Sequence, residues 1–264
     1  MPSPPLLAVA TTDPALALAA EAAGVDLVVL ESGPLDPLLV AARAAARTET
    51  IGIVAAAPTT TTEPFHVSTA IATIDVVARG RAGWLAETPP RAGADGLVTW
   101  DVPEDVLGDA REHVDAVRAL WDSWEEGAEI RDRATDRFVD RERIHHINYA
   151  GAHLAVRGPS ITPRPPQGQP VVVVRDPALA AVADVLLVTD PAAPPVPGVL
   201  RILEVQRGAP HDAEGFDGVL LHGVTATDLT ALARTAPPAG ETLRARLGLP
   251  SPAPNRYAGA AVAS

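Results

Sequence analysis

Short apolar runs alternate with amphipathic stretches along the first third of the chain. Residues 63–87 show this pattern most clearly, because apolar side chains recur at helical spacing from Val67 through Ile71 and Ile74 to Ala78. The turn Gly80–Gly83 ends this predicted helix and leads into an apolar strand at Ala82–Glu87. The order helix, turn and buried strand is typical of one step of a parallel α/β fold.

The same alternation precedes this stretch. Asp13 and Asp36 each stand directly before a proline and a run of alanine and leucine, as expected for a helix with an aspartate N-cap and proline in its first turn. Apolar runs before these helices and before residue 63 predict strands at Leu6–Ala10, Asp26–Glu31 and Thr50–Ala57. Three strand-helix steps indicate a parallel sheet covered by helices.

The second half of the chain is less regular. A helix is predicted at Glu104–Glu125, followed by a charged segment, Glu129–Arg143, which can bury little surface. Ile147–Tyr149 and His153–Val156 are expected to form a hairpin around Ala150-Gly151. Further strands are predicted at Pro170–Val174, Asp184–Val188, Val199–Val205 and Gly218–Leu221, with a short helix after Asp176-Pro177 and a last one at Thr225–Arg234. The prolines of Pro191–Gly198 exclude a helix there.

Eight strands in this order predict a TIM-type (β/α)8 barrel, trimmed of some of its later helices. A doubly wound open sheet is the alternative. We expect one barrel domain over residues 1–264, with a loop and hairpin insertion at about 126–169 and a loose C-terminal tail at about 251–264. Strands without a covering helix should be hidden against another chain, which predicts a homodimer.

Composition narrows the class of protein. Hydrophobic residues make up 47% of the 264 residues but aromatic residues only 3%, so the core must consist of small aliphatic side chains. The formal charge of -12 argues against binding to nucleic acid or an anionic membrane. The absence of cysteine excludes disulfides and thiolate chemistry. No long apolar stretch and no basic leader are present, so a cytoplasmic protein is expected.

Four separated motifs occur in a fixed order along the chain. They are Thr62–His66 with Ile71–Asp75 and Gly80–Trp84; Leu120–Glu125; Gly151–Gly158 with Pro163-Arg164 and Pro166–Gly168; and Leu247–Pro250 with Asn255–Tyr257. This set resembles the bacterial luciferase-like flavin-dependent monooxygenases, in particular the nitrilotriacetate and dibenzothiophene-sulfone branch. The resemblance implies a barrel that holds reduced FMN, supplied by a flavin reductase, against O2 and a small organic substrate at the carboxyl ends of the strands.

The resemblance also implies contacts to the cofactor. These are Glu31 after the second strand, the hydroxyls of Thr59 and Thr60 after the third, Trp84 and Glu87 on the fourth, and Arg175 after the fifth. His66 is the candidate catalytic residue, and the alternative is a residue that packs at the start of its helix. The loop Thr88–Asp101 and the hairpin are expected to shape the substrate pocket.

Two segments depart from the family pattern. Leu85–Thr88 stand where the family commonly has Asn and a Thr-Ser pair, and Arg175-Asp176-Pro177 replace a Gly/Ser-rich turn that receives the flavin phosphate. Proline has no N–H and aspartate repels phosphate, so only Arg175 could compensate. The alternative function is therefore a degenerate, non-catalytic member with weak or no flavin binding, acting as a binding or dimerising partner.

Other conspicuous residues suggest structure rather than chemistry. His145 and His146 are adjacent, so their side chains diverge, and no metal site is expected. Trp121 and Trp124 are expected to anchor the core or an interface, and Arg81 to tie the base of its strand.

Overall fold

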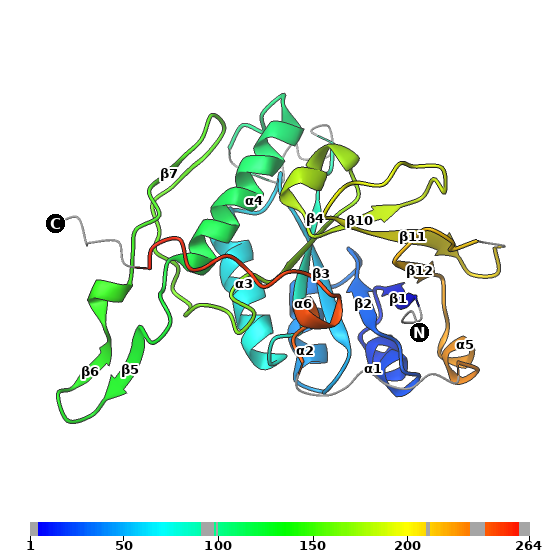
Figure 1. Ribbon diagram of the computed structural model, residues 1–264, viewed down its shortest axis with the longest axis horizontal. Coiled ribbons are helices and arrows are strands. Elements are labelled where there is room, and N and C mark those ends of the chain that lie inside the picture. Colours follow the sequence, from blue (N-terminus) through cyan, green and yellow to red (C-terminus); the bar gives the residue numbers. More distant parts are fainter. Residues whose placement is uncertain (1–4, 91–97, 99, 210–211, 233–240, 259–264) are drawn as a thin grey trace.

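The computed structural model describes residues 5–90, 98, 100–209, 212–232 and 241–258. Its centre is a closed barrel of parallel strands in the order β1-β12-β11-β10-β9-β4-β3-β2 (Figure 1). The strands are β1 (Leu6–Thr11), β2 (Leu27–Leu30), β3 (Gly52–Pro58), β4 (Ala82–Glu87), β9 (Val171–Val174), β10 (Val185–Val188), β11 (Leu200–Gln206) and β12 (Gly218–His222). Because β1 pairs with both β2 and β12, the sheet is closed. The predicted barrel is confirmed, and the open sheet is excluded.

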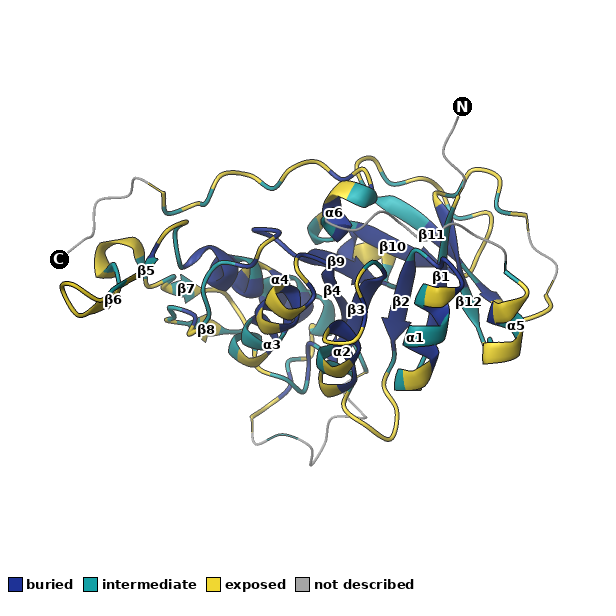
Figure 2. Cartoon of the chain, turned by 90° about the horizontal axis from the view of Figure 1, so that it is seen from below, coloured by how far each residue is buried: buried dark blue, intermediate teal, exposed yellow. Residues whose placement is uncertain are grey.

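Helices cover the first half of the barrel. They are α1 (Pro14–Ala22), α2 (Pro37–Ala45), α3 (Pro64–Val77) and α4 (Val106–Asp122). The predicted aspartate caps are present, since the carboxylate of Asp13 accepts from the Ala15 N–H and that of Asp36 from the Leu38 N–H, each at 2.8 Å. Figure 2 shows the buried strands behind helices whose outer faces are exposed.

The second half of the barrel is thinly covered, as predicted. Between β9 and β10 the chain forms only a 3-10 helix, η3 (Pro177–Val182), and the proline-rich segment 191–198 before β11 contains no helix. The last predicted helix, Thr225–Arg234, is shorter in the structure, where α5 spans Ala226–Thr230. Residues 233 and 234 of the predicted range lie outside the described part. The helices that the prediction leaves out are therefore those that would cover β10, β11 and β12.

Small two-stranded sheets extend from the barrel between α4 and β9. The charged segment expected to bury little surface forms an antiparallel pair, β5 (Glu129–Asp132) with β6 (Arg137–Val139), and a 3-10 turn, η2 (Arg141–Arg143). The predicted hairpin is also present, as β7 (Tyr149–Ala150) with β8 (Ala155–Val156), although its turn lies at residues 151–154. The first pair lacks apolar alternation, so its sequence carries no strand signal.

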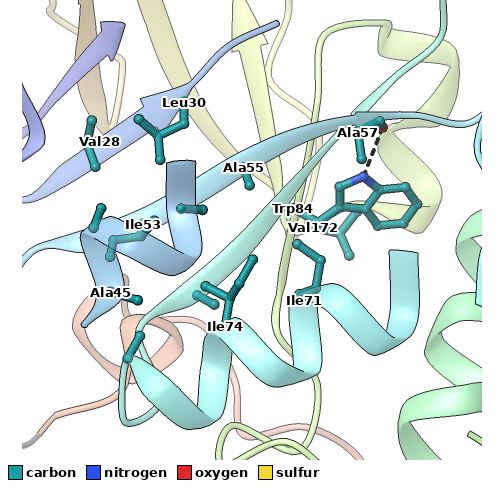
Figure 3. Packing of buried hydrophobic residues seen from close by; sticks show 14 of the residues in the cluster. Val28, Leu30, Ala45, Ile53, Ala55, Ala57, Ile71, Ile74, Trp84 and Val172 are labelled. Carbon is teal, nitrogen blue, oxygen red and sulfur yellow. Dashed lines mark hydrogen bonds between the residues drawn. The ribbon is translucent and has the colours of Figure 1, made fainter. Parts of the chain in front are cut away.

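The hydrophobic core has two layers, one inside the barrel and one between the barrel and its helices. Alternate strand residues divide between them, as Val54 and Ala56 point inward while Ile53, Ala55 and Ala57 point outward. Trp84 belongs to the outer layer, where its indole N–H donates to the Ala57 carbonyl at 3.0 Å (Figure 3). Small aliphatic side chains fill the interior, as the composition predicts.

A short helix that the sequence did not reveal closes the amino-terminal end of the barrel. This helix, α6 (Leu243–Arg246), packs Leu243, with Leu247 and Leu249 after it, into the inner core layer. Arg244 pairs with Asp184 through two hydrogen bonds of 3.0 and 2.9 Å. Four helical residues are too few to show a periodic pattern, which explains why α6 was not predicted.

The segment after α6 is not loose over its described part. The Asn255 amide donates to the carbonyls of Asp122 and Trp124 at 2.7 and 2.9 Å, and Arg256 contacts the Asp122 carboxylate at 3.2 Å. Asn255 and Arg256 therefore fasten this segment to the end of α4; residues 259–264 of the predicted tail lie outside the described part. Among the described helices, none is both long and apolar enough to cross a membrane.

Candidate functional site

Charged side chains converge at the carboxyl-terminal mouth of the barrel. Residues 29, 85, 173, 202 and 220 point into the barrel interior, so the side chains two positions later point into its mouth. These residues form the mouth cluster: Glu31, Glu87, Arg175, Glu204 and His222. The sequence predicted Glu31, Glu87 and Arg175 as cofactor contacts, and the structure brings these three together; it adds Glu204 and His222, which the strand alternation could have revealed.

Arg175 is the centre of the mouth cluster. Its Nε lies 3.0 Å and its Nη2 2.9 Å from Oε1 of Glu204, and Nη2 also donates to Glu31. Its Nη1 lies 3.6 Å from Glu87, whose other oxygen accepts from the Ser32 hydroxyl at 2.9 Å. Burial alone would lower the pKa of Arg175, but the carboxylates of Glu204 and Glu31 outweigh it and raise this pKa. The guanidinium is therefore held firmly in place and in its charged form.

Three ligand-type groups of this cluster also lie close enough to share a cation. Oxygens of Glu31 and Glu204 and a ring nitrogen of His222 lie within 4.8 Å of one another. His222 is 3.3 Å from Glu204 and 3.7 Å from Glu31. Because the Arg175 guanidinium already pairs with both carboxylates, it neutralises the charge that would otherwise favour a metal ion.

The turn after β9, where the resemblance implies the flavin phosphate, has few hydrogen-bond donors that are not already engaged. The N–H of Ala178 donates to the Asp176 carboxylate at 2.9 Å, and that of Leu179 to the Asp176 carbonyl at 3.0 Å. Pro177 has no N–H, and the Arg175 side chain is bound to carboxylates. A phosphate dianion here would face the Asp176 carboxylate, and these donors are already engaged.

The side chains of the other predicted site residues are not part of the mouth cluster. Thr59 is buried beside β4, where its N–H and hydroxyl both donate to the Glu87 carbonyl, at 2.8 and 3.2 Å. Thr60 is buried and its hydroxyl has no partner in the described structure. Trp84 is fully buried in the outer core layer, and its contact with a cofactor stays a prediction. His66 is exposed on the first turn of α3, and its catalytic role stays a prediction.

A pocket of about 510 Å³ lies on the other side of Thr59. We call it the side pocket; it is formed by residues 62–65 at the start of α3, by α4, by residues 100–103 and by residues 153–158 around β8. The loop and the hairpin that were expected to shape a substrate pocket therefore both contribute to its wall, although residues 91–97 and 99 of that loop lie outside the described part. Phe65, Trp100, Leu154 and Val156 supply apolar lining.

His113 is the least expected residue of the side pocket. It lies on α4, is only 1% exposed, and its ring lies 5.7 Å from that of Trp84. Burial lowers the pKa of His113 to about 3, although a hydrogen bond with the Thr59 backbone opposes this shift. Asp109, one turn earlier on the same face, is also buried, and burial raises its pKa. No motif marks His113; the available signal is a polar residue among the apolar positions of an amphipathic helix.

The histidine pair and the tryptophans have structural partners. His145 lies 2.7 Å from Glu125 and stacks on Tyr257, while Nδ1 of His146 lies 2.6 Å from the Gly158 carbonyl. The predicted divergence of the two rings is confirmed. Trp121 and Trp124 donate to the carbonyls of Ser68 and Ser160 at 3.1 and 2.8 Å, and Trp121 is buried in the core.

Sequence comparisons relate most of the chain to monooxygenases. A family model for luciferase-like monooxygenases matches residues 9–194. A pristinamycin IIA synthase subunit from Streptomyces pristinaespiralis is 38% identical over 259 residues, covering 89% of this chain and 87% of that protein. Nitrilotriacetate monooxygenase component A from Aminobacter aminovorans is 41% identical, over 53% of this chain and 31% of that protein. Dibenzothiophene-sulfone monooxygenase from Rhodococcus erythropolis is 35% identical with the same coverage.

Solved structures agree with the barrel architecture. The EDTA monooxygenase from Chelativorans sp. BNC1 superposes with a TM-score of 0.70, covering 94% of this chain and 99% of that chain at 14% identity. A long-chain alkane monooxygenase superposes with a TM-score of 0.65, covering 71% of this chain and 57% of that one at 19% identity. Such low identities show the fold alone. The family model and the match over nearly the full length together show that the chain belongs to the luciferase-like monooxygenases, a family of flavin-dependent enzymes.

Proposed function

We propose that this chain is one subunit of a flavin-dependent monooxygenase that uses reduced FMN and O2 to oxidise a small organic substrate. The observation that carries the proposal is the extent of the match to the pristinamycin IIA synthase subunit, which spans 89% of this chain and 87% of that protein. The matches to nitrilotriacetate and dibenzothiophene-sulfone monooxygenases span only 31% of those proteins. The relative that this chain matches over most of both sequences is thus itself named as a subunit.

The mouth cluster supports a subunit role. In this chain the residues expected to receive the flavin phosphate are engaged, because Arg175 pairs with Glu31 and Glu204, and Asp176 caps η3. A second luciferase-like chain would then supply the phosphate site, and a flavin reductase would supply the reduced flavin. The thinly covered strands β10 to β12 are one place where such a chain could dock. A second copy of this chain is the other partner that the sequence predicts.

The test is reconstitution with flavin binding as the first readout. The purified chain is titrated with FMN, oxidised and photoreduced, and flavin fluorescence and absorbance are followed. We expect no saturation below about 1 mM for the chain alone, which corresponds to a binding free energy weaker than about -4 kcal/mol. Co-expression with each further luciferase-like chain of the same genome should yield a complex that binds FMN and consumes O2 when reductase and NADH are added.

Two outcomes would contradict the proposal in different ways. Saturable binding of FMN by the isolated chain in the micromolar range would show that it holds its own flavin and is a self-sufficient enzyme. A complex that forms but consumes no O2 with any reduced flavin would instead favour a non-catalytic dimerising partner, the alternative that the sequence leaves open.

A further inference from the structure

The side pocket has the composition of a small-molecule site. Its volume of about 510 Å³ falls in the range of sites that hold drug-sized ligands, which combine apolar walls with a few fixed polar groups. Phe65, Trp100, Leu154 and Val156 line it with aromatic and aliphatic surface, and Asp109 and His113 line it from α4. The aromatic share of the whole chain is only 3%, so two aromatic side chains in one lining are a local concentration.

One polar atom of a side chain that lines this pocket has no hydrogen-bond partner among the described residues. Nε2 of His113 is buried and makes no hydrogen bond to any described residue. Buried polar atoms are normally paired, and a native exception calls for an explanation such as a ligand. The ring is held from its other side, because His113 hydrogen-bonds the Thr59 backbone.

The chemistry of a neutral histidine defines what can bind. If Nδ1–H donates to the Thr59 carbonyl, Nε2 carries a lone pair and is an acceptor. The low pKa of His113 keeps the ring neutral across the physiological range, so Nε2 does not become a donor there. The Asp109 carboxylate is likewise a hydrogen-bond acceptor. A matching ligand must therefore present an O–H or N–H group to the α4 wall.

We propose that the side pocket binds a small organic molecule with a ring-containing apolar body and a hydroxyl or N–H group, and that Nε2 of His113 accepts the hydrogen bond from this group. The apolar body would lie against Phe65, Trp100 and Leu154. The side pocket contains no side chain of the mouth cluster, although Thr59, which lines it, hydrogen-bonds the Glu87 carbonyl. Binding of such a molecule is testable on the isolated chain, so its failure would leave the proposed monooxygenase function untouched.

A matched pair of probes tests the acceptor. 2-Naphthol has a ring body and a hydroxyl donor, whereas 2-methoxynaphthalene has the same body without the donor. We expect the wild-type chain to bind 2-naphthol about tenfold more tightly, the usual effect of one buried hydrogen bond. His113→Phe keeps the ring shape but removes the acceptor, so this preference should disappear. His145→Phe makes the same substitution at a histidine that pairs with Glu125 and is not part of the side-pocket lining, and it should keep the preference.

A spectroscopic readout separates ligand recognition from a purely structural histidine. In protein labelled with ¹⁵N-histidine, 2-naphthol should shift the Nε2 resonance of His113, whereas 2-methoxynaphthalene should not. This measurement uses the wild-type chain and decides the question even if His113→Phe does not fold. The proposal is wrong if neither probe binds, if both bind equally, if the preference survives in His113→Phe, or if Nε2 does not respond to 2-naphthol.

Discussion

Arg175 places two of its nitrogens, Nε and Nη2, at 3.0 and 2.9 Å from a single carboxylate oxygen of Glu204. Arg175 directly follows β9, and Glu204 lies on β11, where its side chain points into the barrel mouth. Strand β10 lies between β9 and β11 in the barrel. This pair, together with Glu31 and Glu87, spans the barrel mouth from one side to the other. The guanidinium is therefore a structural tie at the position where the family resemblance implies a cofactor contact.

Removal of this tie should destabilise the barrel. Arg175→Met leaves Glu31, Glu87 and Glu204 facing one another without their shared cation, and we expect the free energy of unfolding to fall by about 1–3 kcal/mol, less than for a fully buried pair because Arg175 is partly exposed. Urea denaturation monitored by circular dichroism measures this change. Arg133→Met, at an exposed arginine of the β5–β6 turn, should change stability by less than about 0.5 kcal/mol.

A double-mutant cycle tests whether Arg175 and Glu204 interact directly. Glu204→Gln removes one of the like charges that Arg175 neutralises, so Arg175→Met should cost less in the Glu204→Gln background than in the wild type. Additive effects of the two substitutions, within about 0.5 kcal/mol, would contradict the tie.

Stability should fall as the pH rises through the titration range of Asp75. This carboxylate is buried at the end of α3 and accepts hydrogen bonds from the Ala82 N–H and from the Gln167 side chain. Burial raises its pKa from 3.8 to about 6, although these hydrogen bonds oppose the shift. The unfolded chain therefore loses this proton more readily than the folded chain, so unfolding becomes easier between about pH 4 and pH 6. The contribution is about 3 kcal/mol.

Asp75→Asn isolates this contribution, because asparagine does not titrate. The variant is expected to be less stable than the wild type at every pH, since its amide nitrogen faces other donors. The stability advantage of the wild type should nevertheless shrink by up to about 3 kcal/mol from pH 4 to pH 7. Glu214→Gln on the surface should show no such trend. A constant difference between wild type and Asp75→Asn across this range would refute the raised pKa.

The barrel was predictable from sequence because its strands are buried on both faces. Such strands are continuous apolar runs, as in Val171–Val174, and each is bounded by a turn residue or a capped helix such as that after Asp36. The strands β5 and β6 and the helix α6 were missed because they are short and their stability depends on tertiary contacts rather than on a periodic pattern.

The site was predictable only in part. The family resemblance named Glu31, Glu87 and Arg175, and they lie together because strand ends collect at one edge of the barrel. Their contact with a cofactor stays a prediction. That Arg175 would pair with Glu204 could not be inferred, since it requires the register of β9 against β11. His113 was missed for a different reason: its place among the apolar positions of α4 indicates burial, but no motif shows whether a buried histidine packs or binds.

Loss of the ion pairs of Asp184 should lower the free energy of unfolding more than loss of the Arg175–Glu204 pair at the barrel mouth. Asp184, at the start of β10, accepts hydrogen bonds from Arg118 of α4 at 3.0 Å, from Arg244 of α6 at 3.0 and 2.9 Å, and from the Val172 N–H at 2.9 Å. Burial raises the pKa of Asp184, but the two guanidiniums outweigh it and the pKa is lowered overall. The stability that this group contributes is therefore present above its unfolded pKa of 3.8 and is lost as the pH falls below that value.

Asp184→Ala should lower the free energy of unfolding at pH 7 by about 3–5 kcal/mol, because two largely buried guanidiniums lose their shared anion. The exposed Glu142→Ala variant should be close to neutral. Thermal denaturation with calorimetry compares the two. A loss below about 1 kcal/mol for Asp184→Ala would show that α6 is held by its leucines alone.

Arg81 offers the most specific test of geometry, because lysine keeps its charge but not its shape. The Arg81 side chain is buried at the start of β4 and donates from two nitrogens to the carbonyls of Ile51 and Thr48, at 2.5 and 2.7 Å. A lysine ammonium is a single point of donation and cannot reach both acceptors in the same arrangement. Arg81→Lys should therefore leave a buried carbonyl unpaired, at a cost of about 1–3 kcal/mol. Arg79→Lys makes the same change two residues earlier, at an exposed position, and should change the urea midpoint little. Equal effects of the two substitutions would show that the charge of Arg81, and not its forked geometry, holds the base of the strand.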